Sequence, residues 1–278
     1  MAPTLNLAGA GHVGRALGRL FAQAGVFAVQ DVLTRAHASA QEAVGFIGAG
    51  RALAPQDAPR DAAVWMLAVG DDQIAPVAAR LAQSVDVRGA VVFHCSGAKA
   101  SDELAALRDA GALVASIHPV RSFADPAAVA RDFAGTFCGV EGDAAALALL
   151  LPAFEAIGAR PVAIDAAAKT VYHAASVFAS NYLVTVLDAA LRAYQAAGIP
   201  EDVARALARP LAAETLANVF RLGPGTALSG PIARGDAATV ARQQAAVDAW
   251  HGPTGALYAA LASATWDLAA RRTTQPPP

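Results

Sequence analysis

Residues 5–14 read LNLAGAGHVG, a short apolar run that leads directly into three glycines with the spacing G-x-G-x-x-G. Residues 15–21, RALGRLF, then read as a helix. In such a strand–turn–helix the first glycine permits a tight turn, the second lets a pyrophosphate approach the backbone, and the third lets helix and strand pack closely. The helix start adds free N–H groups and a partial positive charge. The stretch predicts a dinucleotide-binding turn, with an ordinary glycine-rich turn as the alternative. The predicted contacts are Gly9, Gly11, His12, Val13 and Gly14.

The composition of this 278-residue chain is that of a globular protein with a substantial core, because 55% of the residues are hydrophobic and 16% are charged. The formal net charge of −2 gives no electrostatic basis for binding nucleic acid or an anionic membrane. Cys95 and Cys138 lie far apart and form no C-x-x-C motif, which argues against a disulfide scaffold or a zinc cluster. Since no signal segment precedes the glycines, we expect a cytoplasmic protein.

One segment, residues 170–187, carries no Asp, Glu, Lys or Arg over about the length of helix that crosses a bilayer. It contains several polar side chains, which make it too polar for a lipid-facing helix. We therefore expect a helix buried inside protein, against a second helical layer or another subunit. The polar side chains are Tyr172, His173, Ser176, Ser180 and Asn181.

Short apolar strands alternate with helical segments over residues 1–165, a pattern that predicts a doubly wound parallel sheet covered on both faces. The expected strands are residues 5–8, 26–33, 63–69, 90–94, 114–118, 136–140 and 161–164. The expected helices between them include residues 73–83, 101–110 and 144–156. This α/β region is the predicted Rossmann-type domain.

From residue 166 the strand pattern stops, and residues 166–272 are predicted to form an all-α domain. The expected helices are residues 167–197, 200–219, 237–246 and 254–271, and the tail 273–278 is expected to be disordered. The main break is the glycine- and proline-rich stretch 222–235.

The residue that ends the second strand of this fold selects the cofactor. Enzymes that use NAD place Asp or Glu there to bind the ribose hydroxyls. Here the strand ends in Thr34-Arg35, and an arginine fork suits the 2′-phosphate of NADP. Asp31 is a competing candidate inside the strand, and a solvated surface arginine is the other alternative. We expect NADP, with Thr34 and Arg35 among its contacts.

Further candidates follow the next strands, because ligands of doubly wound sheets bind beyond the carboxyl ends of the strands. Val69 and Asp71 follow one strand, and Ser96 and Gly97 follow the next. We expect these residues near the nicotinamide. The Ser96 hydroxyl is predicted to bind the substrate or the cofactor amide, or else to cap a turn.

His118 ends another strand, and Pro119 holds the backbone there extended. Farther on, a helix carries Lys169, Tyr172, His173, Ser176 and Ser180 on one polar stripe. Lys169 and His173 are one turn apart, and each is a candidate acid for protonating a carbonyl or imine as hydride arrives. The alternative is an exposed lysine above a buried tyrosine–histidine pair.

Two weaker readings complete the set of candidates. Arg234, in a constrained loop, could clamp a substrate carboxylate, but a salt bridge to Asp236 or a helix cap is the simpler interpretation. His94, His118 and His173 could bind zinc, although no ligand spacing supports it, so no metal site is predicted.

Together these residues resemble a family of bacterial proteins that join a Rossmann-like dehydrogenase domain to a helical domain of unknown function. The resemblance covers nearly the whole chain. Besides the glycine motif it rests on residues 94–97 (HCSG), 118–123 (HPVRSF), 172–175 (YHAA), 180–182 (SNY) and 230–236 (GPIARGD). More distantly, the chain is similar to the 6-phosphogluconate dehydrogenase-like superfamily, which includes β-hydroxyacid dehydrogenases, ketopantoate reductase, pyrroline-5-carboxylate reductase and prephenate dehydrogenase. The resemblance implies a helical C-terminal domain of that superfamily's type, a homodimer formed through it, and substrate in the cleft between the domains.

The resemblance carries over residue by residue only in part. Lys169 matches the catalytic lysine of β-hydroxyacid dehydrogenases and ketopantoate reductase, but His173 stands where their asparagine would be. His118-Pro119 is similar to the turn of prephenate dehydrogenases whose histidine binds a substrate hydroxyl. Val120-Arg121 replace the methionine and small residues of that turn, so chorismate-pathway chemistry is not implied.

The expected function is an NADP-dependent oxidoreductase that moves hydride between the nicotinamide and a small carbonyl, imine or hydroxyl compound. Lys169 or His173 is the expected acid, and Ser96 and His118 are expected to position the substrate. The alternative is a sensor or scaffold protein that binds NADP(H) without turnover.

Overall fold

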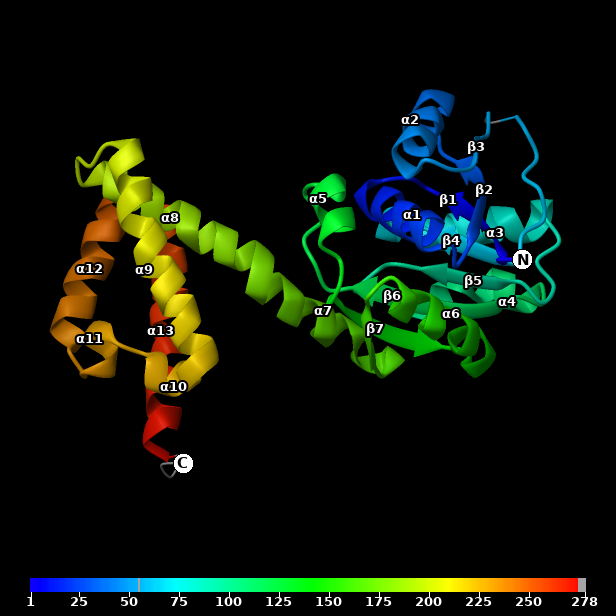
Figure 1. Ribbon diagram of the computed structural model, residues 1–278. Helices are drawn as coiled ribbons and strands as arrows, with labels where there is room; N and C mark the ends of the chain where they lie inside the picture. Colours follow the sequence, from blue (N-terminus) through cyan, green and yellow to red (C-terminus); the bar gives the residue numbers. More distant parts are fainter. Residues whose placement is uncertain (55, 275–278) are drawn as a thin grey trace. The chain divides into compact units, whose positions relative to one another are not determined.

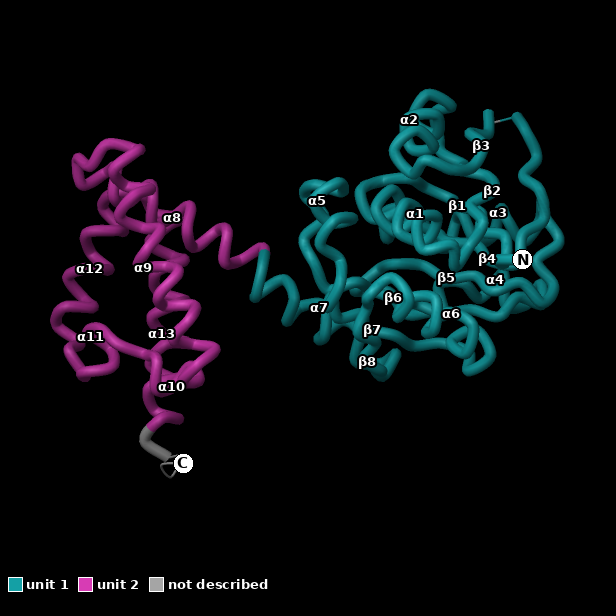
Figure 2. The backbone as a smooth tube through the Cα atoms, in the orientation of Figure 1, with its two compact units in different colours: residues 1–180 teal, residues 181–278 magenta. Residues whose placement is uncertain are grey.

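The computed structural model describes residues 1–54 and 56–274 (Figure 1). The chain divides into two compact units, Met1–Ser180 and Asn181–Pro278, which Figure 2 colours separately. The first is an α/β unit, and the second has helices and no strand among its described residues, which confirms the predicted fold class. The division falls after Ser180, so the helix that begins at Lys169 belongs to unit 1 and not to the helical unit.

Unit 1 is built on an eight-stranded sheet with the order β3-β2-β1-β4-β5-β6-β7-β8. Every pairing is parallel except β6 with β7, so the carboxyl ends of β1, β2, β4, β5 and β6 share one edge. The strands are β1 (Thr4–Ala8), β2 (Ala28–Leu33), β3 (Arg51–Ala52), β4 (Val64–Leu67), β5 (Val91–His94), β6 (Leu113–Pro119), β7 (Phe137–Gly142) and β8 (Arg160–Ala163).

The helices of unit 1 cover both faces of the sheet. They are α1 (His12–Ala24), α2 (His37–Ile47), α3 (Ile74–Ser84), α4 (Ala105–Asp109), α5 (Pro126–Arg131), α6 (Ala144–Ala156) and α7 (Lys169–Val177). Short 3-10 turns precede α3, α4 and α7, namely η1 (Asp71–Gln73), η2 (Ser101–Leu104) and η3 (Ala166–Ala168). The sequence predictions omitted β3, α2 and α5, which are short or weakly amphipathic.

Strand β4 shows why both faces need cover. Val64 and Met66 belong to the apolar cluster that includes α1 and α6, whereas Trp65 and Leu67 belong to the cluster that includes α3 and α4. All four side chains are buried, so the strand reads as a continuous apolar run and not as an alternation. This pattern, repeated in β5, holds the parallel strands in the middle of the unit.

Unit 2 has six helices among its described residues and very little core of its own. Ala204, Thr254 and Gly255 are the only buried residues in the described part of this unit. Large apolar side chains such as Leu211 and Phe220 are exposed. The helices are α8 (Leu183–Ala196), α9 (Glu201–Leu222), α10 (Pro224–Ala227), α11 (Gly230–Ala233), α12 (Ala237–Trp250) and α13 (Gly252–Thr274). Of the expected disordered tail, residues 275–278 lie outside the described part, and α13 continues to Thr274.

The expected helix over residues 167–197 is confirmed as a helical stretch, Ala166–Ala196, with a π-helical turn, Phe178–Tyr182, between α7 and α8. This stretch is long and apolar enough to cross a membrane by length and composition alone. It is not buried within this chain, since Val171 and Val184 are exposed, so its cover by another subunit stays a prediction. The first turn of this stretch is nevertheless fixed to the sheet, because Lys169 is buried there.

A buried carboxylate fastens the amino-terminal half of the sheet. Asp31 of β2 is fully buried and accepts hydrogen bonds from Arg51 Nε at 3.0 Å and from Arg60 Nη2 at 2.6 Å. Burial alone would raise the pKa of Asp31. Hydrogen bonds from the side chain and backbone of Arg60 and from Arg51 outweigh it and lower the pKa to about 2.

We expect Asp31→Asn to lower the free energy of unfolding by about 2 kcal/mol at pH 7, since a pKa shift is a difference in stability. Because the folded pKa lies below the unfolded value, this contribution is complete above the unfolded pKa and is lost as the pH falls toward 2. Urea unfolding at pH 7 and at pH 3 measures it. Asp86→Asn, at the exposed pair with Arg88, should lose little. An equal loss at both pH values for Asp31→Asn would contradict this account.

Candidate functional site

The glycine-rich turn lies at the carboxyl end of β1 and leads into α1. Gly9 adopts the left-handed region with φ +89°, and its N–H donates to the Leu33 carbonyl at 2.8 Å. A side chain at Gly9 or Gly14 would collide with Ala68, the residue after β4. A Cβ at Gly11 would meet no atom within 4 Å, so this part of the turn is open. The backbone therefore has the shape that a pyrophosphate at the start of α1 requires.

The end of β2 presents Arg35 to solvent. Arg35 is exposed and forms no ion pair within the described residues, whereas the Thr34 hydroxyl donates to the Ala36 carbonyl at 2.6 Å. Asp31, the competing candidate, is buried inside the strand and held by two arginines. It is therefore not free to bind a ribose, and Arg35 remains the available side chain at this strand end.

The other cofactor candidates also lie at this edge. Val69 and Asp71 follow β4, and Ser96 and Gly97 follow β5. The Ser96 hydroxyl accepts hydrogen bonds from the backbone N–H groups of Ala98 and Lys99, at 3.2 and 3.0 Å. Ser96 is thus a turn cap in this structure. His12, at the start of α1, is exposed and bonds through Nδ1 to the Phe123 carbonyl at 2.6 Å.

His118, Tyr172 and His173 form what we call the histidine cluster. His118 Nδ1 lies 3.0 Å from the Tyr172 hydroxyl, and the ring centroids of His118 and His173 are 5.7 Å apart. Two glycines make room for these rings. A side chain at Gly97 would overlap both histidines, and one at Gly139, directly opposite His118 in the β6–β7 pairing, would overlap Tyr172. The structure therefore brings together two sequence candidates, His118 and His173, at the tips of β5 and β6.

The two histidines at the strand ends are held neutral. Burial lowers the pKa of His118 to about 4, with His173 and Lys169 acting in the same direction and Asp71 opposing them. Burial also lowers the pKa of His94 to about 4, against a hydrogen bond to the Ala100 carbonyl. Both His94 ring nitrogens have protein partners, since Nδ1 accepts from the Ser96 N–H. His94 is therefore committed to the turn, and among the described residues no group could hold a metal ion.

Lys169 is at the centre of a second, buried network. Its ammonium donates to the Ser96 carbonyl at 3.1 Å and to the Ser116 hydroxyl, and lies 3.7 Å from Glu141 Oε1. The Glu141 carboxylate accepts from the N–H and the hydroxyl of Ser101, both at 2.8 Å. Burial lowers the pKa of Lys169, opposed by Glu141. The ammonium thus makes two hydrogen bonds and one ion pair inside the protein, and these contacts fix α7 to the sheet.

Sequence reasoning missed Ser116 and Glu141. Ser116 precedes His118 by two residues, so both side chains lie on one face of β6. The two-residue alternation of a strand could therefore have identified Ser116 from the sequence. Glu141 faces Ser116 across the antiparallel β6–β7 pair. That pairing cannot be derived from the sequence, so the sequence did not identify Glu141 as the partner of Lys169.

The remaining candidates do not join this cluster. The π-helical turn changes the helical register after α7, so the expected polar stripe does not continue regularly to Ser180, which is exposed. Arg234 belongs to unit 2, where it lowers the pKa of Asp236 less than the hydrogen bonds from Thr239 do. Asp236 caps α12 through the Thr239 N–H at 3.0 Å. Among the described residues Arg234 forms no salt bridge with Asp236, and the side chain that caps the helix is that of Asp236, so the role of Arg234 stays a prediction.

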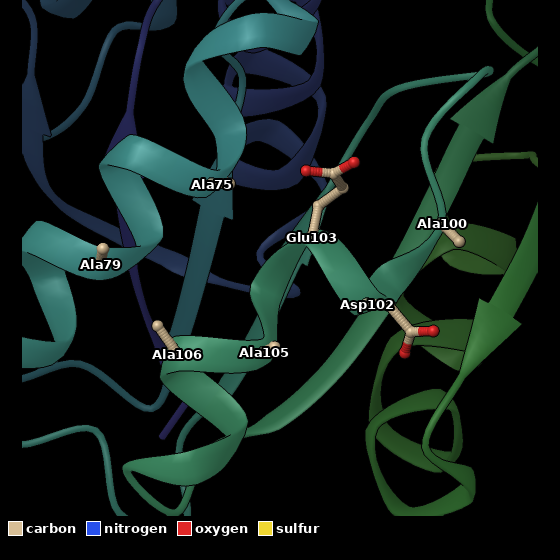
Figure 3. Close-up of a pocket in the computed structure, with 7 residues that line it drawn as sticks. All are labelled: Ala75, Ala79, Ala100, Asp102, Glu103, Ala105 and Ala106. Atoms are coloured by element: carbon tan, nitrogen blue, oxygen red, sulfur yellow. The ribbon is translucent and has the colours of Figure 1, made fainter.

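A hollow of about 470 Å³ lies between α3 and the η2–α4 segment (Figure 3). Most of its lining is alanine, and its two carboxylates, Asp102 and Glu103, are paired with Arg108 and Lys99. It offers no free cation for a phosphate and is not formed by the glycine turn or the histidine cluster. We therefore place the candidate site at the strand ends and not in this hollow.

Two family descriptions match successive parts of the chain. Residues 4–119 match the Rossmann-like domain, and residues 136–265 match DUF2520, a domain of unknown function. The chain joins a Rossmann-like domain to a DUF2520 domain. The resemblance stated from the sequence is thereby confirmed, and the DUF2520 match begins within the sheet, at β7, and includes Glu141 and α7. No curated protein matches the chain significantly.

Solved structures with this architecture align over nearly the full length. A protein from Thermotoga maritima is 25% identical, with a TM-score of 0.73 over 97% of this chain and 99% of that one. A protein from Bacteroides fragilis, described as a candidate NADP oxidoreductase, is 21% identical, with a TM-score of 0.74 over 96% and 98%. An imine reductase from a Pseudomonas species is 18% identical, with a TM-score of 0.63 over 99% and 94%. The Rossmann-like DUF2520 chain shares their fold.

The Lys169–Glu141 pair should show strong energetic coupling. We expect Lys169→Met and Glu141→Gln each to cost about 3–5 kcal/mol, because each leaves an uncompensated buried charge, and the double variant to cost much less than their sum. Urea unfolding of the four proteins measures the coupling. The same cycle on Lys99 and Glu103, a partly exposed pair on one turn, is the control and should show little coupling. Additive losses at Lys169 and Glu141 would refute the role assigned to this pair.

Proposed function

We propose that this Rossmann-like DUF2520 protein is an NADP-dependent oxidoreductase that acts on a small carbonyl, imine or hydroxyl compound. One observation carries the proposal. The open glycine turn and the histidine cluster both stand at the carboxyl edge of the parallel strands of unit 1, where doubly wound sheets bind their ligands. The fold shared with a candidate NADP oxidoreductase and an imine reductase agrees with it.

The residues at the strand ends fit the parts of a dinucleotide. The turn at Gly9 and Gly11 and the first N–H groups of α1 would hold the pyrophosphate. The exposed Arg35, which has no ion-pair partner in the described part of the chain, would with Thr34 hold the 2′-phosphate that distinguishes NADP from NAD. When bound, the nicotinamide supplies the hydride, and the protein orients it and moves a proton.

We assign the proton to His173 and not to Lys169. The Lys169 ammonium is buried, donates two hydrogen bonds to protein acceptors and is paired with Glu141, so it is less accessible to a substrate than His173. His173 is half-buried, lies against Gly97, and forms no hydrogen bond within the described residues. Its ring is therefore available to a ligand beside the tip of β5.

A non-catalytic protein that binds NADP(H) is the second candidate, and the commitment of Lys169 to structure favours it. The residue that matches the catalytic lysine of related dehydrogenases is buried in this chain and bonded to protein groups. A protein of this kind would bind the nucleotide but turn over no carbonyl, imine or hydroxyl compound.

We also propose a homodimer formed through the helical unit. Unit 2 buries very few of its own described residues, and the exposed apolar side chains of α8 and α9, among them Val184 and Leu211, are the surface that a second copy would cover.

The free thiols of Cys95 and Cys138 fit the reducing conditions of the cytoplasm, where we propose that the protein acts on its small-molecule substrate.

Nucleotide preference is tested by thermal shift with NADPH, NADP, NADH and NAD. A ligand at a hundred times its Kd stabilises a protein by about 2.7 kcal/mol, so the cofactors can be distinguished. We expect the wild type to respond most to the phosphorylated pair and Arg35→Ala to lose that preference. Arg80→Ala, an exposed arginine of α3, is the matched control. A wild type that prefers NADH would refute the role of Arg35.

Turnover is tested by NADPH oxidation with a panel of carbonyl and imine compounds. His173→Ala should lower kcat about 10²- to 10⁴-fold while the thermal shift with NADPH is kept, because it removes only the proton donor. Ser176→Ala, on the next turn of α7, should behave as wild type. A wild type that binds NADPH but reduces no member of a broad panel supports the non-catalytic candidate. Full activity of His173→Ala would show that another group is the proton donor.

A further inference from the structure

The hydroxyl of Tyr172 holds one nitrogen of the His118 ring. Tyr172 Oη lies 3.0 Å from His118 Nδ1, and the two rings are nearly perpendicular, at 89°, with centroids 5.6 Å apart. Tyr172 reaches this position only because Gly139, on the neighbouring strand, has no side chain. The contact links α7 to β6. The tautomer of His118 depends on whether the Tyr172 oxygen or His118 Nδ1 carries the shared hydrogen.

The acid and base strengths of the two groups set the direction of this hydrogen bond. A phenol O–H is a stronger donor than the N–H of a neutral imidazole, and the unprotonated imidazole nitrogen is a stronger base than the phenol oxygen. Burial raises the pKa of Tyr172, so the phenol keeps its hydrogen. The Tyr172 hydroxyl therefore donates to His118 Nδ1.

The other ring nitrogen of His118 is left for a ligand. Burial, with His173 and Lys169 adding to it and Asp71 opposing, keeps His118 neutral. A neutral imidazole carries one hydrogen, so a ring that accepts at Nδ1 donates at Nε2. Nε2 lies beside Gly97 at the tip of β5, and no residue in the described part of the chain bonds to it.

We propose that Tyr172 is a positioning residue that fixes His118 as the Nε2–H tautomer, so that a neutral His118 donates a hydrogen bond to an acceptor atom of the substrate, a carbonyl oxygen. The role toward substrate rests on the proposed function, whereas the tautomer is a property of the folded chain alone. This assignment separates the two histidines: His118 polarises the carbonyl and His173 supplies the proton. It also selects carbonyl compounds over protonated imines, which have no lone pair to accept the bond.

The tautomer is measured by long-range ¹H–¹⁵N correlation on the full-length protein labelled with ¹⁵N-histidine, with His118→Gln to assign the signals. The expected wild-type pattern is a protonated Nε2 and an unprotonated Nδ1 whose shift shows that it accepts a hydrogen bond. Tyr172→Phe should move the Nδ1 signal to the position of a free acceptor nitrogen. Tyr194→Phe, on α8, should leave it unchanged. A protonated Nδ1 in the wild type, or an Nδ1 signal that Tyr172→Phe does not move, overturns the proposal.

Kinetics provide the second arm. With a carbonyl substrate, Tyr172→Phe should lower kcat/KM about tenfold, the order expected for one hydrogen bond, and leave the response to NADPH intact. Unchanged kcat/KM for a carbonyl substrate would overturn the role toward substrate. If the wild type binds no nicotinamide nucleotide but shows the expected ¹⁵N pattern, the proposed function fails and the tautomer assignment stands. If Tyr172→Phe does not fold, the wild-type pattern alone decides, because a hydrogen on Nδ1 is incompatible with the proposal.

Discussion

The candidate site depends on one buried ammonium. Lys169 is the first residue of α7, and its side chain contacts the Ser96 carbonyl in the turn after β5, Ser116 of β6 and Glu141 of β7. A buried charge is tolerated only when it is paired and hydrogen-bonded, so this end of α7 has very few alternative positions. With the helix start fixed, Tyr172 and His173 follow one turn later and reach His118. The histidine cluster is thus a consequence of where Lys169 is held.

Glycines at two positions are as important for the histidine cluster as the charge of Lys169. Gly97 and Gly139 stand where α7 presents its aromatic rings to the strand tips, and an alanine at either position would displace them. The open position at Gly11 plays the corresponding part in the dinucleotide turn. In the histidine cluster and in the dinucleotide turn, the neighbouring groups can therefore approach the backbone closely. Backbone positions groups more rigidly than long side chains do.

Much of this arrangement was predictable, because its signals are local. The glycine spacing, the apolar strands and their carboxyl ends, and the period that places Lys169 near His173 are all properties of short windows of sequence. The function of Lys169 was not predictable in the same way. It depends on Glu141, which meets Ser116 through an antiparallel pairing between strands far apart in the chain. Likewise Asp31 was a competing candidate for a ribose ligand, and its actual role is set by Arg51 and Arg60, both distant in sequence, which pair with it. Short sequence patterns therefore predict where these residues lie, whereas contacts between residues far apart in the sequence determine what each residue does.

The electrostatics of the cluster follow from the same pairing. Because Glu141 compensates Lys169 inside the protein, the ammonium offers little net charge to a ligand, although it still helps to keep His118 unprotonated. Because burial lowers the pKa of His118 to about 4, its ring is neutral at neutral pH and keeps one hydrogen to donate. In the proposed function that hydrogen binds a carbonyl oxygen. Lys169 can then be structural, because His173, one turn later on the same helix, is the residue proposed to supply the proton.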